Sequence, residues 1–330
     1  MPLSLSDISI KINREVSGRT LRRWLAAWET GNKVKKTGAG PSTAYIYVAQ
    51  PEDIEALVPA RDSLGFLQGL DTDLRASLIK QIRDLWTHTS TALEGNTLSL
   101  GDTHFILEQG LTISGKPIKD HQEVRGHARA IELLYQSIGL AINKERLFAL
   151  HRAVQTEYID DIYKPIGAWK IESNGTHAVG LDNQQYFIEY ALPLFVPNLM
   201  NEVLAYINAI SSTEISLQNA PEIYAKIHMG IVHIHPFFDA NGRVARLLAN
   251  IPLLKNGLPP LVISQEKRQS YIQALCEYQI SIGQLNSTSG AWPEPEKLVD
   301  FNNFCASSYA STRALVERAF AIQSKRPFNH

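Results

Sequence analysis

Residues 235–246, which read His-Pro-Phe-Phe-Asp-Ala-Asn-Gly-Arg-Val-Ala-Arg, combine residue types that bind phosphate groups with one that can move a proton. The imidazole of His235 has an ordinary pKa that suits a general base near neutral pH. The carboxylate of Asp239 can hold Mg²⁺ that bridges phosphates. Arg243 and Arg246 are three residues apart at the start of a predicted helix, so both guanidinium groups can reach phosphate oxygens. The segment therefore predicts a site for nucleotide chemistry.

Two predicted helices position these residues. The first ends near Ile234, because Pro236 restricts the backbone of the residue before it. The second begins at Asn241-Gly242, where free backbone N–H groups and the positive end of the helix dipole favour a bound anion. Four apolar residues form the buried face of this second helix: Val244, Leu247, Leu248 and Ile251.

The start of the second helix carries Ala240, Asn241 and Gly242. Ala240 and Gly242 are small, so an anion can approach the backbone closely. A purely structural alternative is a buried histidine beside a salt bridge between Asp239 and Arg243. That alternative leaves two arginines crowded at the positive end of a helix dipole, which is costly without an anion. We therefore favour a nucleotide site.

The segment resembles the signature of the Fic family, H-x-F-x-(D/E)-(G/A)-N-(G/K)-R-x-x-R. It meets every position, with Ala240 where Gly is commoner. The resemblance extends over roughly residues 60–285. It implies transfer of AMP from ATP to a Ser, Thr or Tyr hydroxyl of a target protein or of the chain itself, with Mg²⁺ held by Asp239. Gly242 favours this reaction, since family members with Lys there resemble kinases.

The resemblance also implies roles for the other residues of the segment. His235 would be the base that activates the incoming hydroxyl. The backbone of residues 240–242, together with Asn241, would form an anion hole. Arg243 and Arg246 would bind the outer phosphates of ATP.

A second segment, from Ser90 to Gly95, resembles the inhibitory helix of the same family, (S/T)-x-x-x-E-(G/N), which we place at about residues 80–95. The resemblance implies that Glu94 pairs with Arg246 and occupies the place of the γ-phosphate. Ser90 would then orient Glu94 one helical turn away. Taken alone, Glu94 would be an ordinary acid at a helix end. Beside the signature segment, it predicts an inhibited enzyme.

Glycines at 167, 175 and 180 punctuate a β-like stretch at about residues 167–190 and predict a short hairpin. This stretch resembles the family flap, on which a target loop can add as a strand. The flap residues expected to meet the target are Lys170, Ile171 and Glu172, with Lys170 in place of a commoner Arg. The hairpin could instead simply close the core.

Tyr271 and Gln279 follow the segment that the resemblance places behind the adenine pocket. They are candidates for contact with the base or ribose of the nucleotide. Each could equally be an ordinary core or surface residue.

The first 50 residues carry eight Lys or Arg and three Asp or Glu, a net charge of +5, whereas the rest of the chain carries −6. Residues 12–48 resemble a winged helix-turn-helix, in which Thr20 caps a helix that runs through Trp28 and residues 33–47 form a wing. Three arginines at one end of that helix are candidates for DNA contacts: Arg19, Arg22 and Arg23. The alternative is a small module that docks on protein.

The composition sets the class of protein. A chain of 330 residues with 44% hydrophobic residues can bury a sizeable core, and only two cysteines exclude a disulfide scaffold. No apolar stretch approaches the ~20 residues that span a bilayer, and no signal peptide is evident, so we expect a cytoplasmic protein without a membrane partner. The predicted fold is mainly α, with a small winged helix-turn-helix domain at 1–55 and a helical Fic domain with a β-hairpin flap at 56–330.

Three functions stay open on the sequence alone. The first is an AMP-transferase inhibited by Glu94, with ATP and a protein target as partners. The second is a DNA-binding regulator whose Fic domain senses nucleotide. The third is an enzyme that removes AMP from modified protein, with Glu94 positioning a water. A homodimer is a further expectation.

Overall fold

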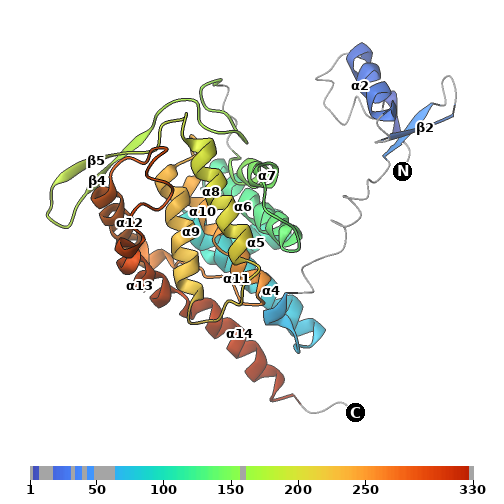
Figure 1. The fold of residues 1–330 in the computed structure, drawn as a ribbon. Helices are drawn as coiled ribbons and strands as arrows, with labels where there is room; N and C mark the ends of the chain where they lie inside the picture. The colour runs from blue at the N-terminus through green and yellow to red at the C-terminus, as the bar shows by residue number, and fades with distance from the viewer. Residues whose placement is uncertain are drawn as a thin grey trace. The chain divides into compact units, whose positions relative to one another are not determined.

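The chain folds into two compact units, Met1–Pro59 and Ala60–His330 (Figure 1). The structure is a computed structural model that describes residues 3–6, 18–30, 34–38, 43–47, 64–156 and 161–326. The second unit is almost entirely helical, and the predicted mainly α fold is confirmed. No helix among the described residues is long and apolar enough to cross a membrane.

The first unit contains one helix and one small sheet. Its described elements are β1 (Leu3–Ser4), α2 (Gly18–Thr30), β2 (Val34–Thr37) and β3 (Ala44–Tyr47). The strands form an antiparallel sheet in the order β1-β3-β2. The two expected strands are therefore present, whereas residues 39–42 of the expected tip lie outside the described part of the chain. The winged helix-turn-helix as a whole stays a prediction, because residues 7–17 lie outside the described part of the chain.

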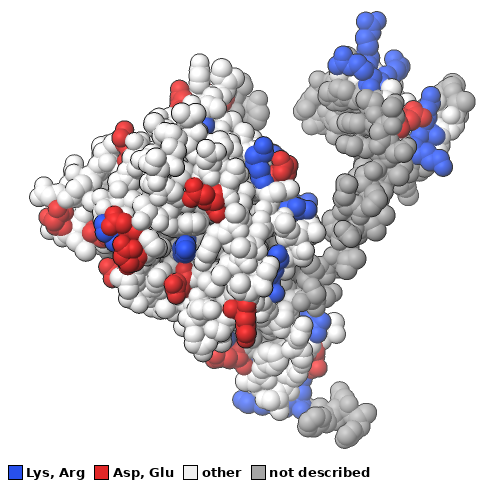
Figure 2. Space-filling model, viewed as in Figure 1, with Lys and Arg blue, Asp and Glu red and all other residues white. Residues whose placement is uncertain are grey.

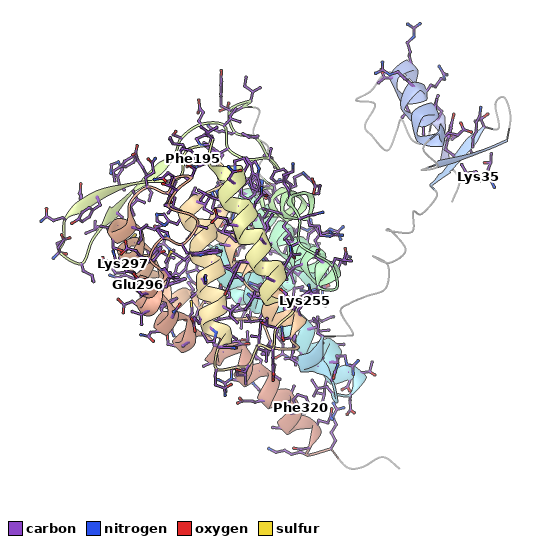
Figure 3. All side chains as sticks on the ribbon, in the orientation of Figure 1. Lys35, Phe195, Lys255, Glu296, Lys297 and Phe320 are labelled. Atoms are coloured by element: carbon purple, nitrogen blue, oxygen red, sulfur yellow. The ribbon has the colours of Figure 1, made fainter. Side chains whose placement is uncertain are left out.

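Helix α2 has a buried side and a charged side. Leu21 and Leu25, one turn apart, are buried, as in any amphipathic helix. Basic side chains are exposed on α2 and on β2, where Figure 3 labels Lys35; they are Arg19, Arg22, Arg23, Lys35 and Lys36 (Figures 2 and 3). The expected helix cap at Thr20 is wrong, because α2 already begins at Gly18 and Thr20 lies within its first turn.

The second unit is a helical bundle with one β-hairpin. Its helices are α4 (Thr72–Ala92), α5 (Leu100–Gln109), α6 (Ile118–Ser137), α7 (Lys144–Val154), α8 (Val196–Ile210), α9 (Ala220–Ile234), α10 (Asn241–Leu248), α11 (Ile251–Lys255), α12 (Arg268–Ile282), α13 (Val299–Ser308) and α14 (Ala310–Gln323). The hairpin consists of β4 (Gly175–Val179) and β5 (Gln185–Glu189). Short 3-10 turns occur at Gly65–Leu67, Gln265–Lys267 and Pro295–Leu298.

Helix α9 is the central element of this unit (Figure 1). It is apolar around most of its circumference, so it is buried between α8, α10 and α13. Helix α4 packs against α5, α6 and α14. Because α9 ends at Ile234 and α10 begins at Asn241, the loop that joins them is also anchored in the core.

The hairpin packs on α12 through one face only. Ala178 of β4 and Ile188 of β5 are buried and form a small cluster with Cys276 of α12. The hairpin that the sequence predicted is thus present, but its first strand starts at Gly175. The expected flap residues 170–172 precede it and belong to neither strand.

Asn250 fastens the end of α10 to the segment behind it. Its side chain is fully buried and bonds only main-chain groups. Its amide donates to the carbonyls of Arg246 and Leu261 at 3.0 Å each, and its oxygen accepts from the N–H of Leu261 at 2.7 Å.

We expect Asn250→Leu to lower the free energy of unfolding by about 2 kcal/mol or more. The variant leaves buried N–H and C=O groups without partners, at ~1–3 kcal/mol each. Urea unfolding measures the change, with Asn201→Leu on the exposed side of α8 as the control. Equal decreases in the free energy of unfolding of the two variants would show that the hydrogen bonds of the Asn250 side chain contribute little to stability.

Candidate active site

The loop between α9 and α10 has a strained backbone. His235 (φ 53°) and Ala240 (φ 64°) are two of the three non-glycine residues with a left-handed backbone in the described chain. Phe237, between them, is fully buried and stacks on the imidazole of His151 at 3.9 Å. Non-glycine residues with a left-handed backbone, such as His235 and Ala240, persist only where the surrounding structure holds them in place. The packing around Phe237 therefore holds the strained residues of the loop in fixed positions.

The side chain of Asn241 closes this loop. It accepts a hydrogen bond from the N–H of Phe237 and donates one to the carbonyl of the same residue, each at 2.9 Å. The family resemblance implied that Asn241 helps to form an anion hole. The structure shows its side-chain amide bonded to the loop, which leaves the backbone N–H groups of the first turn of α10 as donors for an anion.

His235 is placed to act as a base. Its Nδ1 lies 3.2 Å from the carbonyl of Val232, and its ring stacks on Tyr190 with a centroid distance of 3.8 Å. Burial lowers the pKa of His235 to about 3. The imidazole is therefore neutral at neutral pH, with Nδ1–H donating to Val232 and the Nε2 lone pair available to accept a proton.

The guanidinium of Arg246 is the most heavily bonded group of the site. It is 2% exposed. Its Nη2 donates to Oε1 of Glu94 at 2.6 Å and to the carbonyl of Ser90 at 2.9 Å, and its Nε donates to Oγ of Ser90 at 2.9 Å. The pairing of Glu94 with Arg246 that the resemblance implied is present. Ser90, expected to orient Glu94, bonds Arg246 instead, because its hydroxyl and carbonyl both face the guanidinium.

Gly242 leaves room for this ion pair. A Cβ atom built on Gly242 would lie 2.6 Å from Oε1 of Glu94 and 3.1 Å from Nη1 of Arg246. Carbon and oxygen atoms do not approach to 2.6 Å without a bond, so a side chain at this position must displace the carboxylate.

Arg243 and Asp239 lie on the other side of the loop. Arg243 is buried, donates to the carbonyl of Val154 at 3.1 Å and contacts Oδ2 of Asp239 at 3.4 Å. The salt bridge of the structural alternative is thus present. The Asp239 side chain is still 52% exposed, so its carboxylate remains accessible to a cation.

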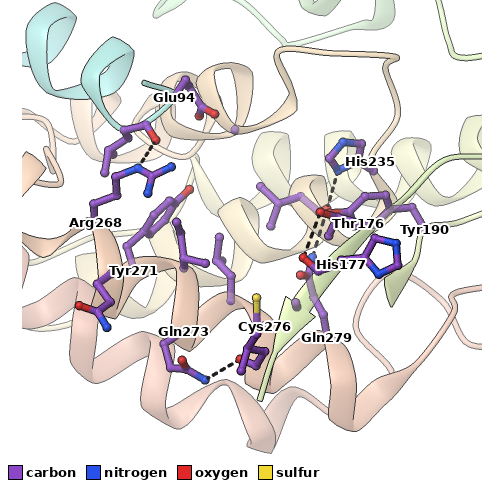
Figure 4. A pocket seen from close by; sticks show the side chains of 18 of the residues that line it. Glu94, Thr176, His177, Tyr190, His235, Arg268, Tyr271, Gln273, Cys276 and Gln279 are labelled. Carbon is purple, nitrogen blue, oxygen red and sulfur yellow. Dashed lines mark hydrogen bonds between the residues drawn. The ribbon is translucent and has the colours of Figure 1, made fainter. Parts of the chain in front are cut away.

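A cavity of about 810 Å³, a size that suits a nucleotide, lies beside His235 and Glu94. Five of the predicted site residues line it: Glu94, His235, Gly242, Tyr271 and Gln279 (Figure 4). The other residues of the signature segment with a predicted role are not among its lining residues: Asp239, Ala240, Asn241, Arg243 and Arg246.

Several residues of the wall opposite α4 were missed by sequence reasoning. It comes from the hairpin and α12, with Thr176, His177, Tyr190, Arg268, Gln273 and Cys276 among its residues (Figure 4). Arg268 also ties α12 to the end of α4, because its Nε donates to the carbonyl of Leu93 at 2.9 Å. The sequence predicted the hairpin and, from the family resemblance, the α12 residues Tyr271 and Gln279. Nothing in the hairpin residues indicated that it would lie over α12.

Tyr271 and Gln279 belong to both the wall and the core. The hydroxyl of Tyr271 lies between Nη1 of Arg246 (3.1 Å) and Nε2 of His228 (3.0 Å), and burial raises the pKa of Tyr271 to about 12. The amide of Gln279 donates to the carbonyl of Val232 at 3.3 Å. Contact of Tyr271 with a nucleotide would therefore use its ring rather than its hydroxyl.

The expected flap residues have unequal surroundings. Ile171 and Glu172 are exposed, as contact with a target requires. Lys170 is 3% exposed, because its ammonium turns inward and donates to Oδ1 of Asn174. The interpretation of Lys170 as a residue that meets a target is therefore wrong.

The sequence and the fold are both similar to those of known proteins. Residues 141–253 match the Fic/DOC family. The chain contains a Fic domain. The fold is similar to that of a Fic domain-containing signalling protein from Bacteroides thetaiotaomicron, with a TM-score of 0.66 and 26% identity, covering 81% of this chain and 97% of that one.

Two curated relatives are protein adenylyltransferases. The chain is 29% identical over 252 residues to fic-1 of Caenorhabditis elegans, covering 76% of this chain and 46% of that protein. It is 29% identical over 224 residues to Fic of Drosophila erecta, covering 67% and 42% respectively. The chain thus spans less than half the length of these relatives.

Four buried histidines of the Fic domain should make its stability fall in acid. Burial lowers the pKa of His151 and of His233 to about 4, and those of His127 and His228 well below 6.5. The same groups titrate near 6.5 in an unfolded chain, so below that pH the unfolded state binds more protons and is favoured.

We expect the free energy of unfolding to decrease as pH falls from about 6.5 to about 4, by up to ~1.4 kcal/mol per pH unit for each histidine. Urea unfolding at several pH values measures this slope. A stability that stays level across this window would contradict the neutral state of the buried rings.

Proposed function

We propose that the chain is a protein adenylyltransferase that Glu94 holds in an inhibited state. It transfers AMP from ATP to a hydroxyl side chain of a target protein or of itself. The observation that carries the proposal is that a neutral His235 and Glu94, whose carboxylate pairs with Arg246, line the same nucleotide-sized cavity. The activity of the two relatives supports the same reaction.

The chemistry follows from the position of His235. The target oxygen attacks the α-phosphorus of ATP and forms a new P–O bond, while the bond from the α-phosphorus to pyrophosphate breaks. His235 accepts the hydroxyl proton on Nε2, which its lowered pKa leaves unprotonated. The backbone N–H groups at the start of α10 favour the negative charge of the phosphates.

Asp239 fits the requirements of Mg²⁺. Its carboxylate is half exposed and directly precedes α10, and Mg²⁺ is usually held by one or two carboxylates together with substrate phosphates and waters. Among the described residues no group of three His, Cys, Asp or Glu gathers as an all-protein metal site. When bound, the ion would offset the charge of the phosphates.

Glu94 inhibits by holding Arg246. A carboxylate on a buried guanidinium makes a charge-assisted hydrogen bond, here at 2.6 Å. ATP must displace Glu94 or bind with its phosphates misplaced. A misplaced α-phosphate is not in line with the attacking hydroxyl, and the rate of transfer suffers. The same carboxylate could position a water for removal of AMP, the alternative reaction.

We expect His235→Ala to reduce transfer by ~10²–10⁴-fold while ATP still binds, because the imidazole acts on the hydroxyl and not on the phosphates. Labelled AMP incorporation and calorimetric ATP binding measure the two effects. His104→Ala, on exposed α5, is the control. Unchanged turnover in the His235 variant would remove this residue from the mechanism.

We expect Glu94→Gly to raise AMP incorporation, above all into the chain itself, because Arg246 becomes available to the γ-phosphate. Glu94→Gln keeps the shape but loses the charge, so it should lie between the variant and the native chain. The assay compares the three proteins at equal ATP and Mg²⁺. If Glu94→Gly incorporates no more AMP than the native chain, Glu94 is an ordinary acid at a helix end and not an inhibitory residue.

A second proposal concerns the first unit, which we infer binds duplex DNA. Its support is the exposed basic surface of α2 and β2, where Arg22 and Lys36 line a cavity of about 410 Å³ together with Thr43 and Tyr45. Hydroxyl and basic groups together suit backbone phosphates.

We expect the full chain to retard DNA at low salt and to lose affinity steeply as salt rises. Joint replacement of Arg19, Arg22 and Arg23 by Gln should abolish the shift without changing AMP transfer. If the native chain gives no shift at low salt, docking on protein is the better explanation of the basic surface.

A further inference from the structure

Lys170 is a buried cation whose role lies outside the functions described so far. It is 3% exposed, and no carboxylate of the described residues pairs with its ammonium. Burial lowers the pKa of Lys170 to about 7. A buried ammonium without a counter-ion is costly, so it is retained only where its hydrogen bonds are needed. Its hydrogen-bond partners therefore identify the part of the molecule that Lys170 stabilises.

The hydrogen bonds of Lys170 reach the main chain on both sides of His235. Its Nζ donates to the carbonyl of Ile234 at 3.4 Å, and its backbone N–H donates to the carbonyl of Pro236 at 2.9 Å. His235 has the left-handed backbone described above, which needs support from its neighbours. Lys170 supplies that support before and after the strained residue.

Asn174 extends the same support. It accepts from Nζ of Lys170 at 2.6 Å and donates to the carbonyl of Phe237 at 3.3 Å. Its own carbonyl accepts from the N–H of Tyr190 at 3.1 Å. The ring of Tyr190 in turn lies flat on the imidazole of His235, at an interplanar angle of 6°. Lys170 and Asn174 thus connect the segment before the hairpin to the loop that carries His235, and to the ring of Tyr190 that covers the imidazole of His235.

We propose that Lys170 is a positioning residue of the transfer reaction: through Ile234, Pro236 and Asn174 it fixes the backbone of His235 so that the imidazole faces the incoming hydroxyl. This inference rests on the proposed AMP transfer. Lys170 does not line the cavity, so it acts on the base and not on ATP. It also has an electrostatic effect, since after burial its charge is the next group that lowers the pKa of His235.

The test uses the full chain with Glu94→Gly, so that transfer is measurable. Lys170→Met removes the ammonium with little change in length, and Asn174→Ala removes its partner. Lys255→Met, on α11 far along the chain and labelled in Figure 3, is the matched control. Three quantities are measured: hydrogen exchange of the backbone amides of residues 235 and 237–241, kcat, and KM for ATP.

We expect faster exchange at residues 235–241 in Lys170→Met and Asn174→Ala, with α9 exchanging as in the control. We expect kcat to fall by about 10²-fold while KM for ATP is unchanged, because the misplacement affects the base alone. The acid limb of the pH profile of kcat should move to higher pH, since His235 and Tyr190 are the titratable groups that face Lys170 and the imidazole loses a neighbouring cation.

Unchanged exchange of the loop in both variants would overturn the proposal, and so would equal acceleration throughout the domain, which would indicate a general loss of stability. A rise in KM with constant kcat would place Lys170 in nucleotide binding instead. If the Glu94→Gly chain transfers no AMP at all, the proposed function fails, but the exchange measurement still decides whether Lys170 fixes the loop.

Discussion

The burial of the Arg246 guanidinium constrains the whole Fic domain. A charge that is 2% exposed must be matched by hydrogen-bond acceptors, and they come from separate helices. Ser90 near the end of α4 and Glu94 just after that helix contribute two of these groups, and α12 contributes the Tyr271 hydroxyl. Two distant parts of the chain therefore meet at one guanidinium, since Ser90 and Arg246 are 156 positions apart. Glu94 is the acidic partner that the described residues supply, and on the proposed function a phosphate of ATP would take its place.

Local sequence rules succeeded where the structure is determined locally. The end of α9 at Ile234 and the start of α10 at Asn241 follow from Pro236 and from the apolar pattern of residues 244–251. The contact of Glu94 with Arg246 came from the family resemblance and not from any local rule, since the two residues are 152 positions apart. The wall formed by Thr176 and Tyr190 had neither source and was missed.

Three polar side chains have partners that the sequence did not predict. The family resemblance gave Asn241, Ser90 and Lys170 roles toward an anion, Glu94 and a target, but their side chains bond other parts of the protein. Asn241 bonds the main chain of Phe237, Ser90 bonds Arg246, and Lys170 bonds Asn174. Buried polar groups need partners, and the nearest partners in a packed domain are backbone groups that sequence patterns do not reveal. The direction of a long, flexible side chain such as that of Lys170 is equally absent from spacing.

Gly242 makes the residue type at its own position depend on the residue type at position 94. Its missing Cβ is what lets the Glu94 carboxylate reach Arg246, since any added carbon would lie 2.6 Å from Oε1. The two positions are therefore coupled. A side chain at 242 would push the Glu94 carboxylate from its present place on Arg246, whereas a chain without Glu94 has no such need for glycine. Across relatives of this chain, a residue other than glycine at the matching position should accompany the loss of the glutamate, and the pair should be inherited as one character.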